Sequence, residues 1–282
     1  MPIKLNLKKF RRAYKVGFQK LWRKQTKENN KLVYKYYKNG FDKSINDFLD
    51  TEQVIQGNYE MYFQDEVTQK MFLDIYINTG LKFYNWYINS YQSFIKKEVS
   101  SEETMENFIT NYVLYSSRLT QKIDSVKKTA LKTVVSQFSS VMEDENFLKE
   151  SRLGKAKILQ NKLNGKALWE AKRIVVTETT LASNLGAEKA SLTAFKPEEL
   201  VKDWIIGSSM NHRIGHLDLD AQDPIPMSKD FVNPQTGVAM RIPGEGPASE
   251  TINCSCQAAF IPNPELLNRQ EDDERFIDVD VG

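Results

Sequence analysis

The sequence predicts an α+β protein, in which an N-terminal bundle of long helices precedes a small C-terminal module of one helix and short antiparallel strands. The distribution of proline is the first reason. The chain has no proline between Pro2 and Pro197, whereas eight prolines occur from Pro197 onward. Because proline interrupts helices and removes a backbone donor, long helices are expected before residue 197 and turns with short strands after it. The second reason is the spacing of apolar residues.

Apolar side chains recur every three or four positions in the first two thirds of the chain, as in amphipathic helices. The first stripe is Phe10, Tyr14, Phe18 and Trp22. The second is Tyr84, Tyr87, Ile88, Tyr91, Phe94 and Ile95. A third runs from Phe108 to Val141 and predicts a long helix, continuous or with a break, which Ser101 can cap. Such stripes usually form the core of a helical bundle.

Residues 143–165 are polar and contain Gly154 and Gly165, which predicts a connection or a helix end. A further helix is expected at about 166–195. These patterns suggest three parts of the chain. They are a helical region at 1–160, a compact module at 161–262 and an acidic tail at 263–282.

Four elements are expected after Pro197: a strand, a short helix, a hairpin and a last strand. The helix carries His212 and His216, with Ser208 or Ser209 as its cap. The strands are expected at 201–206, 231–232 paired with 238–242, and 251–260.

The charge balance is close to neutral in total but uneven along the chain. Residues 1–43 hold fourteen Lys and Arg residues and only two acidic ones, whereas 271–280 are strongly acidic. The basic start is a candidate surface for DNA or an acidic protein, and its alternative is a solvated helix face. The candidate contact residues are Lys8, Lys9, Arg11, Arg12, Lys15, Arg23 and Lys24. The first aromatic stripe could anchor a partner groove or pack internally.

Membrane and secretory signals are not expected. No apolar run reaches the roughly 18 residues that cross a bilayer, and the N-terminus has no apolar signal core. Two cysteines are too few for a disulfide scaffold, and one intervening residue would strain a disulfide between them. The expected compartment is therefore the cytoplasm.

The only two histidines and two cysteines of the chain lie within 45 residues: His212, His216, Cys254 and Cys256. Histidines at i and i+4 share a helix face, and thiols at i and i+2 share a strand face. These donors suit tetrahedral zinc, although zinc-binding cysteines are usually further apart in sequence. The alternatives are buried thiols beside a hydrogen-bonded histidine, which we prefer, or a catalytic thiol with His216 as its base. No phosphate-binding glycine loop occurs.

Five landmarks in order resemble the Mu F-like head-morphogenesis family of bacteriophages. Residues 173–187 read R-I-V-V-T-E-T with Ala182, Asn184 and Ala187, and resemble the family's R-I-x-x-T-E-T helix. Trp204 follows, and residues 213–220 match R-x-x-H-x-x-L-D. Phe231, Gly237 and the 243–244 Pro-Gly stand at the family's hairpin and turn, and residues 252–256 resemble its I-N-C-R-C ending. The motif residues are Arg173, Thr177, Glu178, Trp204, Arg213, His216, Asp220, Asn253, Cys254 and Cys256.

The sequence departs from the family's pattern at several positions. Two serines at 208–209 stand where an acidic residue is common, and the turn at 243–247 is one residue longer than usual. Ala221 replaces a glycine, Ser255 replaces an arginine, and His212 has no counterpart. The resemblance therefore singles out His216, Cys254 and Cys256 as the shared cluster, whereas zinc would remain a further possibility for all four donors.

The resemblance implies a structural minor head protein rather than an enzyme. It would act in head assembly or genome delivery, bound to the portal or the inner capsid of the virion. The alternatives are a metal- or thiol-dependent enzyme packaged in the virion, or a non-specific nucleic-acid-binding protein.

Overall fold

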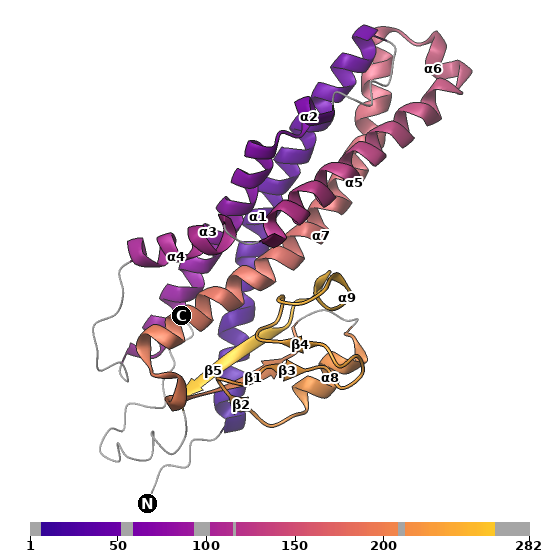
Figure 1. The fold of residues 1–282 in the computed structure, drawn as a ribbon. Helices are drawn as coiled ribbons and strands as arrows, with labels where there is room; N and C mark the ends of the chain where they lie inside the picture. The colour runs from indigo at the N-terminus through magenta and orange to yellow at the C-terminus, as the bar shows by residue number, and fades with distance from the viewer. Residues whose placement is uncertain (1–6, 52–58, 93–101, 115–116, 208–211, 263–282) are drawn as a thin grey trace, which may run out of the picture. The chain divides into compact units, whose positions relative to one another are not determined.

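A computed structural model describes residues 7–51, 59–92, 102–114, 117–207 and 212–262 (Figure 1). It confirms the α+β class. The helices are α1 (Leu7–Thr51), α2 (Tyr59–Tyr62), α3 (Asp65–Ser90), α4 (Glu102–Leu114), α5 (Ser117–Met142), α6 (Glu145–Lys149), α7 (Arg152–Ala194), α8 (Ile214–Asp220) and α9 (Ala248–Thr251). The strands are β1 (Leu200–Ile205), β2 (Ile225–Pro226), β3 (Phe231–Val232), β4 (Ala239–Met240) and β5 (Gln257–Pro262).

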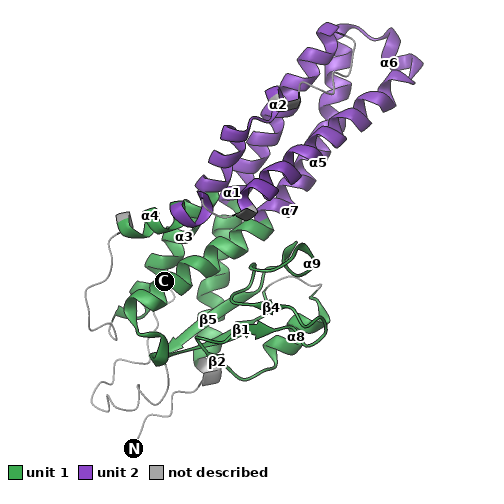
Figure 2. Cartoon of the chain, in the orientation of Figure 1, with its two compact units in different colours: residues 1–27, 75–110, 176–282 green, residues 28–74, 111–175 purple. Residues whose placement is uncertain are grey.

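The chain forms two compact units, each built from separated segments (Figure 2). Unit 1 contains 1–27, 75–110 and 176–282, and unit 2 contains 28–74 and 111–175. The expected division at residue 160 differs from this one because α1, α3 and α7 each contribute to both units. A boundary drawn along the sequence could not represent helices that are shared in this way.

The sheet of unit 1 has three antiparallel strands in the order β2-β1-β5. Val201 pairs with Ile261, and Trp204 pairs with Ala258. Every residue of β5 is buried. Strands that are covered on both faces are apolar throughout rather than alternating, which explains the Ala-Ala-Phe-Ile run of β5. The strand and hairpin expected at 201–206 and 231–242 are confirmed, with Phe231 opposite Met240.

Helices of unit 1 bond directly to backbone carbonyls of β5. The Tyr14 hydroxyl of α1 donates to the Ala258 carbonyl at 3.0 Å, and the Tyr87 hydroxyl of α3 donates to Phe260 at 2.9 Å. The first aromatic stripe packs inside the same unit, where the Phe18 and Phe83 rings lie 4.5 Å apart. Tyr14, Phe18 and Trp22 are buried, so the hypothesis that they anchor a partner groove is wrong and the internal alternative holds.

Unit 2 is a helical bundle with an aromatic core. Phe63 contacts the rings of Tyr36, Tyr37 and Phe41 with centroid distances of 5.6–6.1 Å. The ring centroids of Phe48 on α1 and Phe138 on α5 lie 4.6 Å apart, so these rings join the two helices. These contacts bury the apolar stripes of the helices, which is the usual source of helix stability in water.

The expectation of a connection at 143–165 is wrong, because α6 and most of the first half of α7 lie there. Leu159, Leu163, Ala167 and Ala171 follow one another at steps of four and are all buried. Burial of this apolar stripe outweighs a cost of about 1 kcal/mol for each glycine inside the helix. The C-terminal end of the expected 166–195 helix is confirmed at Ala194.

Other expected boundaries shift in smaller ways. The stripe from Phe108 to Val141 is divided between α4 and α5, as the broken-helix alternative allowed. The last strand begins at Gln257 rather than at residue 251, because Thr251 ends α9. Ser101, Phe94, Ile95, both candidate cap serines and the acidic tail lie outside the described residues. No helix within the described ranges is both long and apolar enough to span a membrane.

Candidate functional site

The candidate site lies in unit 1, between α8 and the segment that joins α9 to β5. His216 projects from α8, and Cys254 and Cys256 precede β5. A turn shapes the cysteine segment: the Cys254 amide donates to the Thr251 carbonyl at 3.0 Å, and Asn253 has a φ of 58°. Asparagine tolerates this left-handed backbone better than most residues. The turn aims both sulfurs at the histidine.

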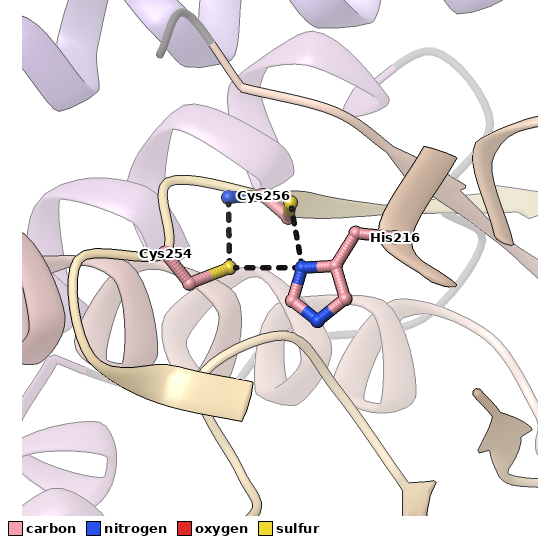
Figure 3. Close-up of side chains that lie close together, drawn as sticks. All are labelled: His216, Cys254 and Cys256. Carbon is pink, nitrogen blue, oxygen red and sulfur yellow. Dashed lines mark hydrogen bonds between the residues drawn. The ribbon is translucent and has the colours of Figure 1, made fainter. Parts of the chain in front are cut away.

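Both thiols converge on one ring nitrogen (Figure 3). His216 Nδ1 lies 3.7 Å from Cys254 Sγ and 3.6 Å from Cys256 Sγ. The backbone amide of Cys256 also donates to Cys254 Sγ at 3.4 Å. The three residues are 1–4% exposed, so solvent does not separate the donors.

The other ring nitrogen of His216 is held by a buried carboxylate. Nε2 lies 3.0 Å from Glu250 Oε2, which also accepts a hydrogen bond from Asn233 Nδ2 at 3.0 Å. The second oxygen of Glu250 accepts from the Thr236 hydroxyl at 2.9 Å. The Trp204 ring meets the imidazole edge-on, with centroids 5.1 Å apart. The imidazole therefore has one orientation, fixed on three sides.

The cluster has strongly perturbed protonation. The hydrogen bond from Cys256 and the nearby His216 hold the pKa of Cys254 well below its usual range, against the effect of burial. The same bond to Cys254, together with burial, raises the pKa of Cys256. Burial opposes charge on His216, yet its bonds to Cys254 and Glu250 raise its pKa overall. The site thus favours a thiolate at Cys254.

Helix α7 braces the cysteine segment through polar side chains. The Thr180 hydroxyl donates to the Cys254 carbonyl at 2.7 Å. Asn184 Nδ2 reaches the carbonyls of Cys256 at 3.1 Å and Pro243 at 3.2 Å, and its Oδ1 accepts from the Ala258 amide at 2.8 Å. Asn184 is fully buried, so these bonds satisfy backbone groups that water cannot reach.

Arg11 is used inside unit 1, although the sequence suggested it as a partner contact. Its guanidinium donates to the carbonyls of Trp204 and Asp220 and pairs with the carboxylates of Asp203 and Asp220 at 2.8–2.9 Å. Asp220 also accepts from the Ile206 amide at 3.0 Å. Arg11 therefore joins α1 to β1 and α8.

The buried carboxyl beside Arg11 gives a pH prediction. Burial raises the pKa of Asp203 to about 7 from 3.8, although Arg11 opposes this shift. Because the folded pKa is the higher one, protonated Asp203 stabilises the fold at low pH, and that stabilisation is lost as pH rises from about 4 through 7. We expect Asp203→Asn to reduce the fall in melting temperature between about pH 5 and about pH 8. Thermal denaturation of wild type and variant at both pH values measures this fall in melting temperature.

Asp218→Asn is the matched control for this measurement. Asp218 accepts a hydrogen bond from Gln235 at the surface, so its loss should leave the pH difference of the wild type in place. An equal fall in wild type and Asp203→Asn would contradict the prediction.

The remaining motif residues divide into two groups. Three of them make contacts within unit 1. The Thr177 hydroxyl accepts from the Asn253 amide at 3.1 Å, and the Glu178 carboxylate accepts from the Tyr76 hydroxyl at 2.7 Å. Arg213 donates to the Ile252 carbonyl at 2.8 Å. Arg173 instead belongs to unit 2. There it pairs with Glu170 at 3.6 Å and lies over the Trp169 ring at 5.0 Å.

His212 does not belong with the other three donors. Helix α8 begins at Ile214, so His212 precedes it, and the i, i+4 helix geometry expected for the two histidines is wrong. Among the described residues, the group of converging donors is His216, Cys254 and Cys256. The predicted set of four metal ligands is therefore reduced to three residues.

The basic candidates occupy several environments on α1. Arg12, Arg23 and Lys24 are exposed, and Lys15 is partly buried. The side chains of Lys8 and Lys9 lie outside the described residues. The exposed basic residues are therefore the ones accessible to a partner.

Sequence reasoning missed Glu250 and Thr180. Nothing in their local sequence distinguishes them from a surface carboxylate and a helix-interior threonine, and only their tertiary neighbours give them a role. No family model, curated protein or solved structure matches this chain.

Proposed function

We propose that this chain is a bacteriophage minor head protein of the Mu F-like kind, which acts in head assembly without catalysing a reaction. One observation carries the proposal: motif residues from distant parts of the sequence bond to one another. Thr177 meets Asn253, Asn184 meets Cys256, and His216 meets Cys254. Separate weak motifs are better explained as one shared module when their residues build a common core.

A structural role fits the way these side chains are used. Both ring nitrogens of His216 have partners, and Glu250 accepts three hydrogen bonds. Cys254 is 4% exposed, so a substrate would have to open the core before reaching the sulfur. Catalytic thiols usually lie in partly exposed positions instead. We therefore favour assembly over the thiol-enzyme alternative.

The proposed place of action is the virion, at the portal or the inner capsid, with assembly in the host cytoplasm. The exposed basic residues of α1 in unit 1 supply charge for an acidic portal surface: Arg12, Lys20, Arg23 and Lys24. Complementary charge steers association and suppresses wrong partners. DNA would also be attracted to such a face, without sequence preference.

Co-expression of the full chain with the portal protein of the same phage tests the proposal. We expect the two proteins to co-elute in size-exclusion chromatography, with a fixed mass ratio from light scattering. A chain that stays monomeric in the presence of both the portal and the major capsid protein would contradict the proposal.

A charge reversal tests the basic face itself. We expect Arg12→Glu, Arg23→Glu and Lys24→Glu together to weaken the complex strongly and to remove its salt dependence. The matched control reverses three exposed lysines of α7 in unit 2: Lys157, Lys162 and Lys166. If both triple variants weaken the complex equally, net charge rather than the face on α1 is responsible.

A further inference from the structure

We propose that His216, Cys254 and Cys256 bind one zinc ion, with a water molecule completing the tetrahedron. Two thiolates and one imidazole are donors that zinc prefers. This inference does not depend on the proposed role in head assembly.

The spacing of the donor atoms fits a tetrahedral ion. Zinc–sulfur bonds of about 2.3 Å and zinc–nitrogen bonds of about 2.0 Å place nitrogen and sulfur about 3.5 Å apart in a tetrahedron. His216 Nδ1 lies 3.7 Å and 3.6 Å from the two sulfurs, and all three donor atoms lie within 4.8 Å of one another. The donors are therefore already placed for one ion, without rearrangement of the backbone.

The surroundings prepare the histidine as a ligand. Metal-binding histidines commonly donate their second N–H to a carboxylate, which fixes the tautomer that leaves the other nitrogen free to coordinate. Glu250 lies in that position, 3.0 Å from Nε2, and is itself held by Asn233 and Thr236. In that tautomer the lone pair of Nδ1 would face an ion placed between Nδ1 and the two sulfurs.

Simple core packing explains the cluster less well. Buried thiols can act as small hydrophobic groups, but such a role does not require both sulfurs to meet the same imidazole nitrogen. The amide of Cys256 donates to Cys254 Sγ at 3.4 Å, a contact that stabilises a thiolate. A disulfide is also disfavoured, because only one residue separates two cysteines that are free in the structure.

The metal would cross-link two segments that are 38–40 residues apart. It would join α8 to the segment that precedes β5, next to the buried side chains of Trp204 and Glu250. Since a metal that binds only the folded chain adds its binding energy to folding, metal removal should destabilise unit 1.

The first experiment measures metal content in the full-length protein purified without chelators or a histidine tag. We expect about one zinc per chain by inductively coupled plasma mass spectrometry. X-ray absorption should show two sulfur and two nitrogen or oxygen neighbours around the zinc. Because the sequence contains only two cysteines, two sulfur ligands identify Cys254 and Cys256 directly.

Substoichiometric zinc that does not rise on incubation with zinc chloride would overturn the proposal. So would bound zinc without sulfur neighbours. Both readouts use the wild-type chain, so they do not depend on whether any variant folds.

Variants then test the ligand set. Cys254→Ser with Cys256→Ser should lose the zinc, whereas His212→Ala should keep it. Retention by the double serine variant, or loss in His212→Ala, would contradict the three assigned ligands. Glu250→Gln should weaken zinc affinity about 10–100-fold, and an unchanged affinity would overturn the positioning role of Glu250.

Discussion

Replacing Asn184 with alanine is expected to lower the free energy of unfolding by about 3–5 kcal/mol. The amide of this fully buried side chain bonds to the carbonyls of Pro243 and Cys256 and accepts from the amide of Ala258. Alanine would leave these three backbone groups without partners in the core. Each such group costs about 1–3 kcal/mol, since water cannot replace the lost bond. Urea denaturation monitored by circular dichroism measures the loss.

Ser183→Ala provides the matched control for Asn184. Ser183 is equally buried on α7, but its hydroxyl donates only to the Thr179 carbonyl one turn earlier. A carbonyl in a helix already accepts a backbone bond, so this loss should cost about 1 kcal/mol or less. Equal destabilisation by both variants would contradict the role given to Asn184 as the brace of β5.

Gly186→Ala is expected to destabilise the protein by about 2–3 kcal/mol, although alanine is normally the better helix former. Within unit 1, α7 approaches α3 so closely at this point that a Cβ on Gly186 would collide with the backbone of Gly80. Backbone atoms cannot move aside as the end of a flexible side chain can. Thermal and urea denaturation should both report the loss.

Gly165→Ala is the control, because it makes the same change in the same helix. No atom lies within 4 Å of a Cβ built on Gly165. The substitution should therefore stabilise the protein by about 1 kcal/mol through helix propensity alone. Opposite signs for the two variants are expected. A stabilising Gly186→Ala would show that the two helices are not in contact there.

The sequence predicted the buried faces of the helices better than it predicted where the helices begin and end. The four-residue spacing of Tyr14, Phe18 and Trp22 predicted a buried face correctly, since helix geometry alone puts such residues together. The start of α7 within 143–165 was not predicted, because glycines and charged residues there obscure the four-residue spacing of the buried Leu159 and Leu163. Propensity is a weak signal where tertiary packing supplies the stability.

The candidate site was predicted in part, and one step of the reasoning was wrong. Cys254 and Cys256 were expected to share a strand face, yet both precede β5, and the turn at Asn253 brings their sulfurs together. His216 was placed on a helix correctly, whereas His212 lies before it. The spacing of donors in sequence suggested a cluster but could not choose its members.

The α+β class, the strand around Trp204, the hairpin of β3 and β4, and the grouping of histidine with cysteine could all be predicted from the sequence. These features follow from periodicity, proline and composition, which act over a few residues. The folded structure was needed to show that Arg11 pairs with Asp203, that Asn184 braces β5, and that Glu250 orients His216. Those bonds join residues far apart in the chain, and their geometry depends on how the helices pack around the sheet.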